Sequence, residues 1–201
     1  MQLDDLRGKY RGAVAESYEA RRTGTEKWRI EQAAIESLIP RLAGPILDAP
    51  CGTGRFMAAV NAVGKLYVGV DISGDMLSVA LNQPVASEAR HILLEADILA
   101  VPLAARSMGS AICARFLNWL EPDDAAAAVA ELARVASRSV VVSMGVVHVG
   151  PPRKGRSRGS VYHDAGAVRS WFDAHGFSLT CTVPLGGDHE KQSAVARFDR
   201  Y

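Results

Sequence analysis

The sequence predicts an α/β protein with a Rossmann-like, doubly wound sheet of seven strands, five parallel and two in a C-terminal antiparallel hairpin, with helices on both faces. Short apolar runs alternate with longer segments of helical periodicity, a glycine-spaced turn follows the first run, and a few polar residues join the last two strand-like runs. So short a connection joins antiparallel neighbours, because a parallel return needs a crossover of a dozen residues or more.

Five apolar runs are expected to form the parallel strands. Each is short, rich in β-branched residues and apolar on both faces, which is typical of strands buried between two helical layers. The runs are PILDA (45–49), LYVGVD (66–71), HILLEAD (91–97), SAICAR (110–115) and SVVVSMG (139–145). The hairpin strands are expected in GFSLTCTVPL and SAVARFDRY, on either side of GGDHEKQ.

The helices between these runs have recognisable ends. Ser73 and Asp164 can each cap the start of a helix, Pro122 suits a first helical turn, and Gly176 suits a helix stop. Before the first strand the rhythm changes, because residues 2–22 and 25–43 both have helical patterns. We therefore expect one domain over 1–201, with a helical cap or lid at 1–43 and the Rossmann-like core at 44–201.

Composition limits the function classes. The chain has 201 residues and a formal net charge of +1, so no overall field would recruit nucleic acid or an anionic membrane. Cys51, Cys113 and Cys181 lie far apart, which suits reduced thiols and offers no zinc-site spacing, so no metal is expected. With no apolar signal region and no membrane-length apolar stretch, we expect a cytoplasmic protein. Monomer and homodimer both stay open.

The stretch ILDAPCGTGR, residues 46–55, predicts a cofactor site at the end of the first strand. Gly52 and Gly54 lack Cβ atoms, so the backbone can approach a ligand and adopt positive φ, and a helix expected from near Arg55 would point its N–H groups at the same place. A dinucleotide fingerprint would need glycine where Met57 stands. A simple strand-to-helix turn is the alternative.

Three acids sharpen this interpretation. Asp48, Asp71 and Asp97 each end one of the first three strands, so they should lie along one edge of a parallel sheet, where ligands bind. An acid after the second strand can accept both hydroxyls of a ribose. One after the third can meet an adenine amine, with the Ile98 N–H beside it. A single strand-end Asp is usually only a turn former, but three together favour a nucleoside-bearing cofactor.

The chain resembles the class I S-adenosylmethionine-dependent methyltransferases of the single-domain, small-molecule type. The resemblance spans residues 40–201 and implies methyl transfer from S-adenosylmethionine to an acceptor, leaving S-adenosylhomocysteine. Pro50 departs from the family, which often has glycine there. The N-P-P-Y tetrapeptide of base and glutamine methyltransferases is missing. The matching segments are DAPCGTG (48–54), GVDIS (69–73) followed by GDMLSVA, EADI (95–98), ARFLNWLEP (114–122) and the hairpin (176–198).

The resemblance also implies roles for individual residues around the cofactor. The acid and glycines of the first turn would hold the methionine part, the acid after the second strand the ribose, and the segment after the third strand the adenine edge. The residues so implied are Asp48, Gly52 and Gly54 for methionine, Asp71 for ribose, Ile72 and Met76 beside adenine, Asp97 and Ile98 at its edge, and Arg115 beside the sulfonium; Ala49 and Cys51 of the turn and Tyr18 complete the expected set.

Two segments are expected to build the acceptor pocket. The first helical pattern has Tyr10, Val14 and Tyr18 on one face, which either roofs the cofactor and acceptor or packs on the sheet edge. The second segment, HVGPPRKGRSRGSVYH at 148–163, is either a solvated connector or a lid that recruits an anionic acceptor through its cations. These cations are Arg153, Lys154, Arg156 and Arg158, of which Arg153 and Arg156 are the candidate acceptor-binding residues.

No catalytic residue is assigned with certainty, because a methyl transfer needs a general base only when the attacking group is a weak acid. His148 and Tyr162 flank the basic segment and are the candidate proton acceptors, whereas His163, beside Asp164, is expected to be structural. A small-molecule acceptor is expected, with its identity and attacking atom left open. Two other functions remain: a non-catalytic S-adenosylmethionine-binding module, and an NAD(P)-dependent oxidoreductase, which the missing third glycine disfavours.

Overall fold

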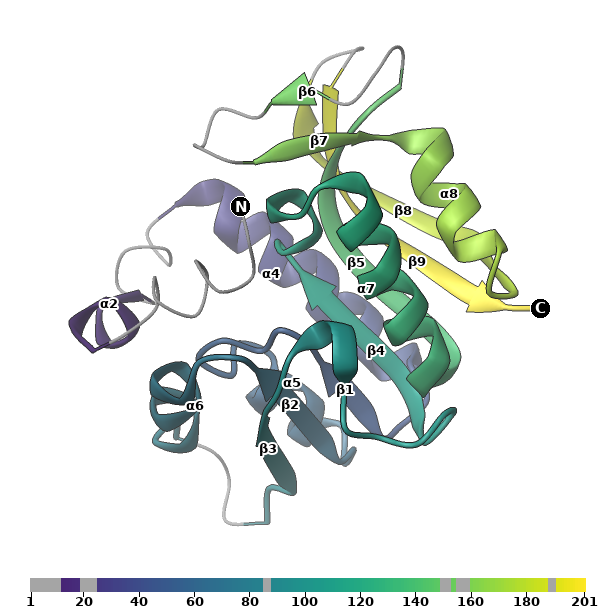
Figure 1. Ribbon diagram of the computed structural model, residues 1–201. Coiled ribbons are helices and arrows are strands. Elements are labelled where there is room, and N and C mark those ends of the chain that lie inside the picture. Colours follow the sequence, from purple (N-terminus) through teal and green to yellow (C-terminus); the bar gives the residue numbers. More distant parts are fainter. Residues whose placement is uncertain (1–11, 19–24, 85–87, 149–152, 155–159, 188–190) are drawn as a thin grey trace.

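The computed structural model describes residues 12–18, 25–84, 88–148, 153–154, 160–187 and 191–201 (Figure 1). Their centre is a nine-stranded sheet with the order β3-β2-β1-β4-β5-β7-β6, to which β9 adds by pairing with β5 and β8. Among the described residues, no helix is both long enough and apolar enough to cross a membrane.

The five parallel strands are confirmed in the predicted chain order. Their bounds are Ile46–Asp48 (β1), Tyr67–Asp71 (β2), His91–Glu95 (β3), Met108–Ala114 (β4) and Ala136–Val147 (β5). From β1 the chain moves outward through β2 to β3, and then returns to build β4 and β5 on the other side. The strand order therefore reverses between β1 and β4, and the carboxyl ends of these strands are the favoured place for a ligand.

The C-terminal hairpin is also confirmed. It consists of β8 (Phe177–Gly187) and β9 (Lys191–Arg200), and β9 runs antiparallel to β5. The structure adds two short strands to the seven that were predicted, β6 (Arg153–Lys154) and β7 (Val161–Asp164). Both lie in or beside the glycine-rich basic segment. Strands of two and four residues are too short to show the alternation of apolar and polar side chains by which a strand is predicted from sequence.

Strand β7 occupies a particular place in the sheet. The last β4 residue paired with β5 is Ala114, opposite Ser143, and β7 pairs in parallel with β5 just beyond, at Val146 and Val147. Because β9 covers the other edge of β5 at these residues, β7 continues the line of β4 past its carboxyl end. The segment after β5 is thereby brought next to the expected ligand-binding edge.

The helices follow the predicted end signals. The Ser73 hydroxyl accepts a hydrogen bond from the Met76 N–H at 3.3 Å, Asp164 accepts one from the Ala167 N–H at 2.8 Å, and Gly176 has a φ of +76°. The helices are α2 (Ala13–Glu16), α4 (Glu26–Leu38), α5 (Met57–Ala62), α6 (Gly74–Leu81), α7 (Pro122–Val135) and α8 (Ala165–Asp173), with short 3-10 turns at Ile39–Arg41 (η1), Ile98–Ala100 (η2) and Leu117–Trp119 (η3).

Side chains that alternate along the strands fill two cores, one on each face of the sheet. Leu47 of β1 packs in the core under α7 and α8, and its neighbour Ile46 packs in the core under α4 and α5. The helical pattern at 25–43 is confirmed as α4 and η1, which cover the second core. Of the pattern at 2–22, only α2 lies within the described residues, and it contacts α6.

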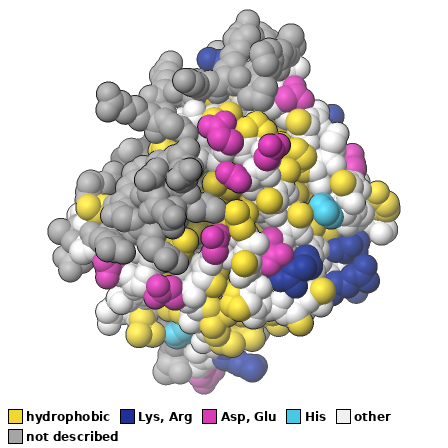
Figure 2. All heavy atoms as spheres, viewed as in Figure 1, with side chains coloured by type: hydrophobic (Ala, Val, Ile, Leu, Met, Phe, Trp, Pro, Cys, Tyr) yellow, Lys and Arg dark blue, Asp and Glu magenta, His cyan; other side chains and the backbone are white. Residues whose placement is uncertain are grey.

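The C-terminal end of helix α7 is capped by Arg200, the last residue of β9. Figure 2 shows acidic side chains near the start of α7 and arginines near its end, an arrangement that suits the helix dipole. The Arg200 guanidinium donates to the carbonyl oxygens of Ala133 and Ala136 at 2.8 and 3.1 Å and lies 4.3 Å from the Phe177 ring centroid. One side chain thus satisfies backbone acceptors that the helix end leaves unpaired.

We predict that Arg200→Ala lowers the free energy of unfolding by roughly 1.5–3 kcal/mol, because charge-assisted hydrogen bonds to these carbonyls are lost. Urea denaturation measures the change. Arg138→Ala, at an exposed site near the start of β5, is the matched control and should change stability by less than about 0.5 kcal/mol. Equal stability of the two variants would contradict a clamp at the end of α7.

Candidate functional site

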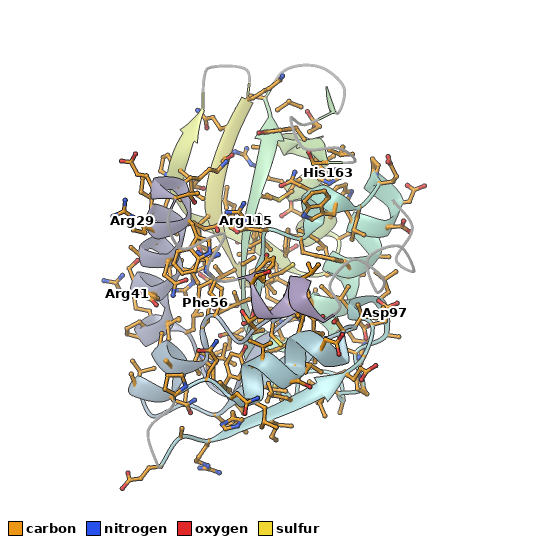
Figure 3. All side chains as sticks on the ribbon, turned by 90° about the vertical axis from the view of Figure 1, so that its left-hand side faces the viewer. Arg29, Arg41, Phe56, Asp97, Arg115 and His163 are labelled. Atoms are coloured by element: carbon orange, nitrogen blue, oxygen red, sulfur yellow. The ribbon has the colours of Figure 1, made fainter. Side chains whose placement is uncertain are left out.

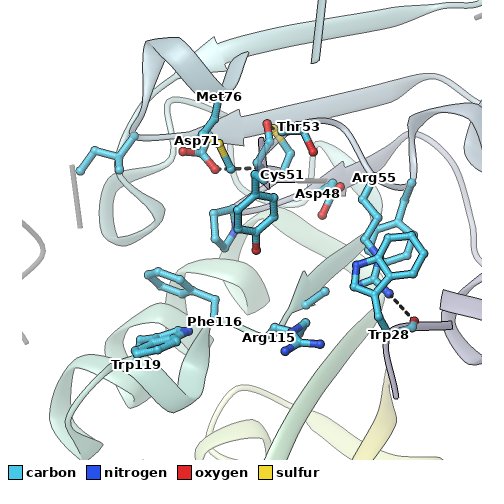
Figure 4. A pocket seen from close by; sticks show the side chains of 16 residues that line it. Trp28, Asp48, Cys51, Thr53, Arg55, Asp71, Met76, Arg115, Phe116 and Trp119 are labelled. Atoms are coloured by element: carbon cyan, nitrogen blue, oxygen red, sulfur yellow. Dashed lines mark hydrogen bonds between the residues drawn. The ribbon is translucent and has the colours of Figure 1, made fainter. Parts of the chain in front are cut away.

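A pocket opens at the carboxyl ends of β1, β2 and β4, where the strand order reverses (Figure 4). The turn after β1 and the start of α6 form one side, and the segment after β4 forms the other. Tyr18, which follows α2, and Trp28 of α4 complete the wall. The lining residues are Tyr18, Trp28, Asp48, Pro50–Phe56 without Gly54, Asp71, Ile72, Met76, Ala114–Phe116 and Trp119.

The turn after β1 has the expected backbone geometry. Gly52 has a φ of +55° and Gly54 a φ of +79°, conformations that favour glycine. Gly52 lines the pocket, whereas a Cβ on Gly54 would come within 3.2 Å of the Ala80 Cβ, so Gly54 serves close packing against α6. Helix α5 begins at Met57, two residues after Arg55, and has six residues.

Asp71 ties this turn to the start of α6. Its two carboxylate oxygens accept hydrogen bonds from the Gly52 N–H at 2.8 Å and the Ser73 N–H at 2.9 Å. Burial raises the pKa of Asp71, while the backbone N–H groups of Ser73, Gly52 and Ile72 act in the opposite direction. Each oxygen has a second lone pair, so the carboxylate can hold the turn and still accept hydroxyl groups from a ligand.

Asp48 lies in a drier environment at the end of β1. It is 1% exposed, and one oxygen accepts a hydrogen bond from the Tyr67 hydroxyl at 2.8 Å. Its other oxygen, Oδ1, is buried without a hydrogen-bond partner among the described residues. Burial raises the pKa of Asp48 from 3.8 to about 7, against the lowering effects of the Tyr67 hydrogen bond and the Arg55 charge. An unpaired buried acceptor in a pocket wall suits a donor supplied by a ligand.

A small hollow beside the main pocket brings the third acid to the same edge. Asp97 accepts a hydrogen bond from the Leu99 N–H at 2.9 Å and so caps η2, as a turn-forming Asp would. It nevertheless faces the hollow together with Ile72 and Ile98. The full lining is Pro50, Val70, Asp71, Ile72, Ala96, Asp97, Ile98 and Phe116, so the hollow adjoins Asp71.

A buried charge network behind the pocket was not expected from the sequence. Glu31 of α4 is 3% exposed and accepts from the guanidinium groups of Arg55 at 2.8 Å and Arg115 at 3.5 Å, and from the Ser143 hydroxyl at 2.8 Å. Arg55 also donates to the Trp28 carbonyl oxygen at 3.0 Å and lies over the Trp28 ring. The available signal was a glutamate within the apolar face of α4.

Arg115 has an unusual backbone conformation for a residue with a side chain. Its φ is +57°, and its N–H is directed at the Ser143 carbonyl and hydroxyl oxygens, at 3.1 and 3.0 Å. Figure 3 shows Arg115 directed inward between α4 and the sheet, whereas Arg29 and Arg41 lie on the outer side of the molecule. The conformation is thus held by β5, and it places the guanidinium beside the pocket.

A second pocket adjoins the first and shares Tyr18, Arg115 and Trp119 with it. The Tyr162 ring forms part of its wall and lies against Gly145, where a Cβ would be 2.5 Å from the ring. Polar groups from α4, β5 and β9 also reach it. Its lining is Tyr18, Lys27, Glu31, Arg115, Asn118, Trp119, Ser143–Gly145, Ser160, Tyr162, Leu185 and Ser193.

Several predicted site residues lie elsewhere. His148 is exposed, forms a hydrogen bond to Gln192 at 3.0 Å, and lines neither pocket. Ala49 is fully buried and does not line the first pocket. Cys51, in contrast, lines this pocket, and burial raises the pKa of its thiol. His163 is buried with Nε2 2.9 Å from the Leu117 carbonyl oxygen, as its structural assignment requires. Tyr10, Arg156 and Arg158, and the side chains of Arg153 and Lys154, lie outside the described part of the chain.

We predict that Asp48 makes the ligand-free protein less stable as the pH rises. Between its ordinary pKa of 3.8 and its folded pKa of about 7, the folded state keeps a proton that the unfolded state has lost. This contribution to stability is therefore lost as the pH rises across that window, by up to roughly 4 kcal/mol. The Asp48→Asn substitution removes this pH-dependent contribution, and its amide oxygen can still accept the hydrogen bond of the Tyr67 hydroxyl.

Urea denaturation of both proteins at about pH 5 and about pH 8 measures the difference. Relative to the wild type, Asp48→Asn should gain several kcal/mol between these values. Parallel pH dependences in the two proteins would contradict a raised pKa at Asp48.

Comparison with known proteins agrees with this geometry. Residues 46–139 match the family described as "Methyltransferase domain". The chain is 39% identical over 90 residues to a ubiquinone/menaquinone biosynthesis C-methyltransferase of Syntrophotalea carbinolica, covering 44% of this chain and 37% of that one. It is 33% identical over 105 residues to a malonyl-[acyl-carrier protein] O-methyltransferase of Serratia marcescens, covering 52% and 39%. The chain thus spans about two fifths of the length of these relatives.

Among solved structures, the magnesium protoporphyrin IX methyltransferase of Synechocystis PCC 6803 with bound S-adenosylhomocysteine shares the fold, with a TM-score of 0.78 at 17% identity and complete coverage of both chains. The matched residues 46–139 hold the glycine turn, all three strand-end acids and Arg115. The sequence match over residues 46–139, the shared fold and the position of the pocket all agree with the resemblance to class I S-adenosylmethionine-dependent methyltransferases.

Proposed function

We propose that the protein transfers the methyl group of S-adenosylmethionine to a small molecule bound in the second pocket. The observation that carries this proposal is the shared wall of Tyr18, Arg115 and Trp119, because a ligand in either pocket would contact these residues. The named relatives include C- and O-methyltransferases, so they leave the attacking atom open. The geometry of this chain's own pockets supports two ligands side by side.

The residues of the first pocket fit the chemical groups of the cofactor. Asp71, with a spare lone pair on each oxygen, would accept the two ribose hydroxyls. The hollow between Ile72, Ile98 and Asp97 would receive the adenine ring. The buried Oδ1 of Asp48, which has no hydrogen-bond partner among the described residues, suits the methionine ammonium group. When bound, the cofactor supplies a methyl group on a cationic sulfur that an acceptor can attack directly.

The charge network fixes the wall between the two pockets. Arg55 belongs to the cofactor turn and Arg115 to the end of β4, and both are attached to Glu31 of α4. Their guanidinium groups are therefore held in place before a ligand arrives, so little conformational entropy remains to be lost on binding. Alignment of two bound molecules and exclusion of water are the contributions that this arrangement offers to the reaction.

We predict that S-adenosylhomocysteine binds the protein and raises its melting temperature, whereas NAD does not. Loss of the hydroxyl contacts in Asp71→Ala should weaken S-adenosylhomocysteine binding by about 1.5–3 kcal/mol in calorimetry. Asp71→Asn, which keeps one carbonyl oxygen, should show an intermediate loss.

Because Asp71 also holds the Gly52 and Ser73 N–H groups, each variant needs its unfolding curve measured beside its binding curve. Glu88→Gln, at an exposed position, is the control for loss of a surface carboxylate. Failure of the wild type to bind S-adenosylhomocysteine would refute the proposed function. Normal affinity in a folded Asp71→Ala protein would remove only Asp71 from the site.

Proton release provides a separate test of Asp48. With its pKa raised to about 7, Asp48 is largely protonated at mildly acidic pH, and an adjacent ammonium group favours the ionised form. We expect S-adenosylhomocysteine binding at about pH 6.5 to release a substantial fraction of one proton, with less released at about pH 8.5. Calorimetry in two buffers of different ionisation enthalpy measures the release, which Asp48→Asn should abolish. Equal release from both proteins would place the ammonium elsewhere.

A further inference from the structure

The wall of the second pocket has more positive than negative charge. Lys27 stands at its edge, where Nζ donates to the Ser193 hydroxyl at 3.0 Å. Among the described residues, no carboxylate lies within ion-pair distance of Lys27. Arg115 must share the single carboxylate of Glu31 with Arg55. Two cations, Lys27 and Arg115, thus line this pocket beside the one carboxylate of Glu31, which Arg55 also pairs with from the first pocket, and this charge balance favours an anionic ligand.

The same pocket offers no good proton acceptor among its described residues. Among the lining residues that the structure describes there is no histidine or aspartate, and their one carboxylate, Glu31, already accepts from two guanidinium groups and the Ser143 hydroxyl. Both oxygens of Glu31 are therefore already engaged by these three donors. The other oxygen-bearing side chains of the described lining are hydroxyl groups of serine and tyrosine and the amide of Asn118. An acceptor whose attacking atom needs no deprotonation by the protein would suit this lining.

Resting on the proposed methyl transfer, we propose that the acceptor is a carboxylic acid, held as its carboxylate by Lys27 and Arg115, and that the product is its methyl ester. A carboxylate is anionic at neutral pH, so it matches the charge of the pocket and needs no general base. Neutral phenols, alcohols and protonated amines would each have to lose a proton first. Trp119, Tyr162 and Leu185 in the wall favour an acid with a flat or apolar body.

The bonds and charges of this step balance. A carboxylate oxygen forms a bond to the methyl carbon while the carbon–sulfur bond breaks, and its electron pair remains on sulfur. The negative charge of the acid and the positive charge of the sulfonium are both lost, which leaves a neutral ester and a neutral thioether. No proton, oxidant or further reactant is needed. Removal of both charges together also suits a site that excludes water.

The first test measures binding without turnover. The S-adenosylhomocysteine complex is titrated with benzoate, cinnamate and indole-3-acetate, each beside its carboxamide, which has a similar shape but no charge. At least one acid should bind about tenfold tighter than its amide, as a charge-assisted hydrogen bond allows. An absence of any acid preference across the three pairs would overturn the proposal.

Variants then assign the preference to the pocket. Lys27→Met keeps the aliphatic stem and should reduce the preference for acid over amide by about tenfold, whereas Lys27→Arg should keep most of it. Arg29→Met removes a cation from an exposed position of the same helix and should change nothing. Affinity for S-adenosylhomocysteine should be the same in all four proteins. An equal effect of Lys27→Met and Arg29→Met would mean general surface charge rather than a carboxylate site.

The second test identifies the bond that forms. The protein is incubated with methyl-labelled S-adenosylmethionine and the same acids, beside phenol and aniline as acceptors that would give an ether or an amine. Mild alkali should release the label from the acid products as methanol, because esters hydrolyse and methyl ethers and amines do not. Label transferred to phenol or aniline but to none of the acids would overturn the proposal. Failure of S-adenosylhomocysteine binding would instead refute the proposed function.

Discussion

The candidate site depends on the ion pairs and hydrogen bonds of one buried carboxylate, that of Glu31. It joins α4 to the turn after β1 through Arg55, to the end of β4 through Arg115, and to β5 through Ser143. A buried carboxylate is costly unless it is paired and hydrogen-bonded, and here all its contacts come from segments far apart in the chain. The wall between the pockets therefore forms only when α4, β4 and β5 are all in place. Loss of Glu31 would leave two guanidinium groups close together with no anion between them.

The strand-end acids show how position on the sheet and local environment divide their tasks. Asp48 and Asp71 end neighbouring parallel strands, yet their hydrogen bonds differ. Asp71 accepts from the backbone N–H groups of Gly52 and Ser73, whereas Asp48 accepts from one tyrosine hydroxyl and has a second oxygen without a partner in the described part of the chain. Burial raises the pKa of both, and for Asp48 it outweighs the hydrogen bond and the Arg55 charge enough to reach about 7. The Asp71 carboxylate thus accepts hydrogen bonds that hold the turn after β1. The charge of the Asp48 carboxylate, in contrast, depends on the group that binds beside it.

The sequence predicted the parts of the fold that follow from short-range chemistry. Several features depend only on neighbouring residues: the apolar runs, the helix caps at Ser73 and Asp164, and the positive φ at Gly52. Because parallel strands end at the same edge of the sheet, residues that follow different strands could also be predicted to lie together. Long-range relations were out of reach. The Arg55–Glu31 pair spans 24 positions and the Ser143–Glu31 contact 112, and the sequence pattern does not specify that these residues meet. The exposed place of His148, bonded to Gln192, likewise depends on β9 lying beside β5.

The same distinction separates the two pockets. The first pocket is formed mainly by turns that directly follow strands, so its residues are placed by the regular geometry of the sheet. The second pocket depends on β7. This strand lies past the end of β4 because β4 does not reach Val146 and Val147 of β5, which leaves that edge of β5 free to pair with β7. Tyr162 reaches the pocket from β7 by lying on Gly145, a contact that any larger residue at 145 would block. On the proposed function, changes in the segment between β5 and β7 would therefore alter which acceptor fits the second pocket while the strand ends that line the first pocket stay unchanged.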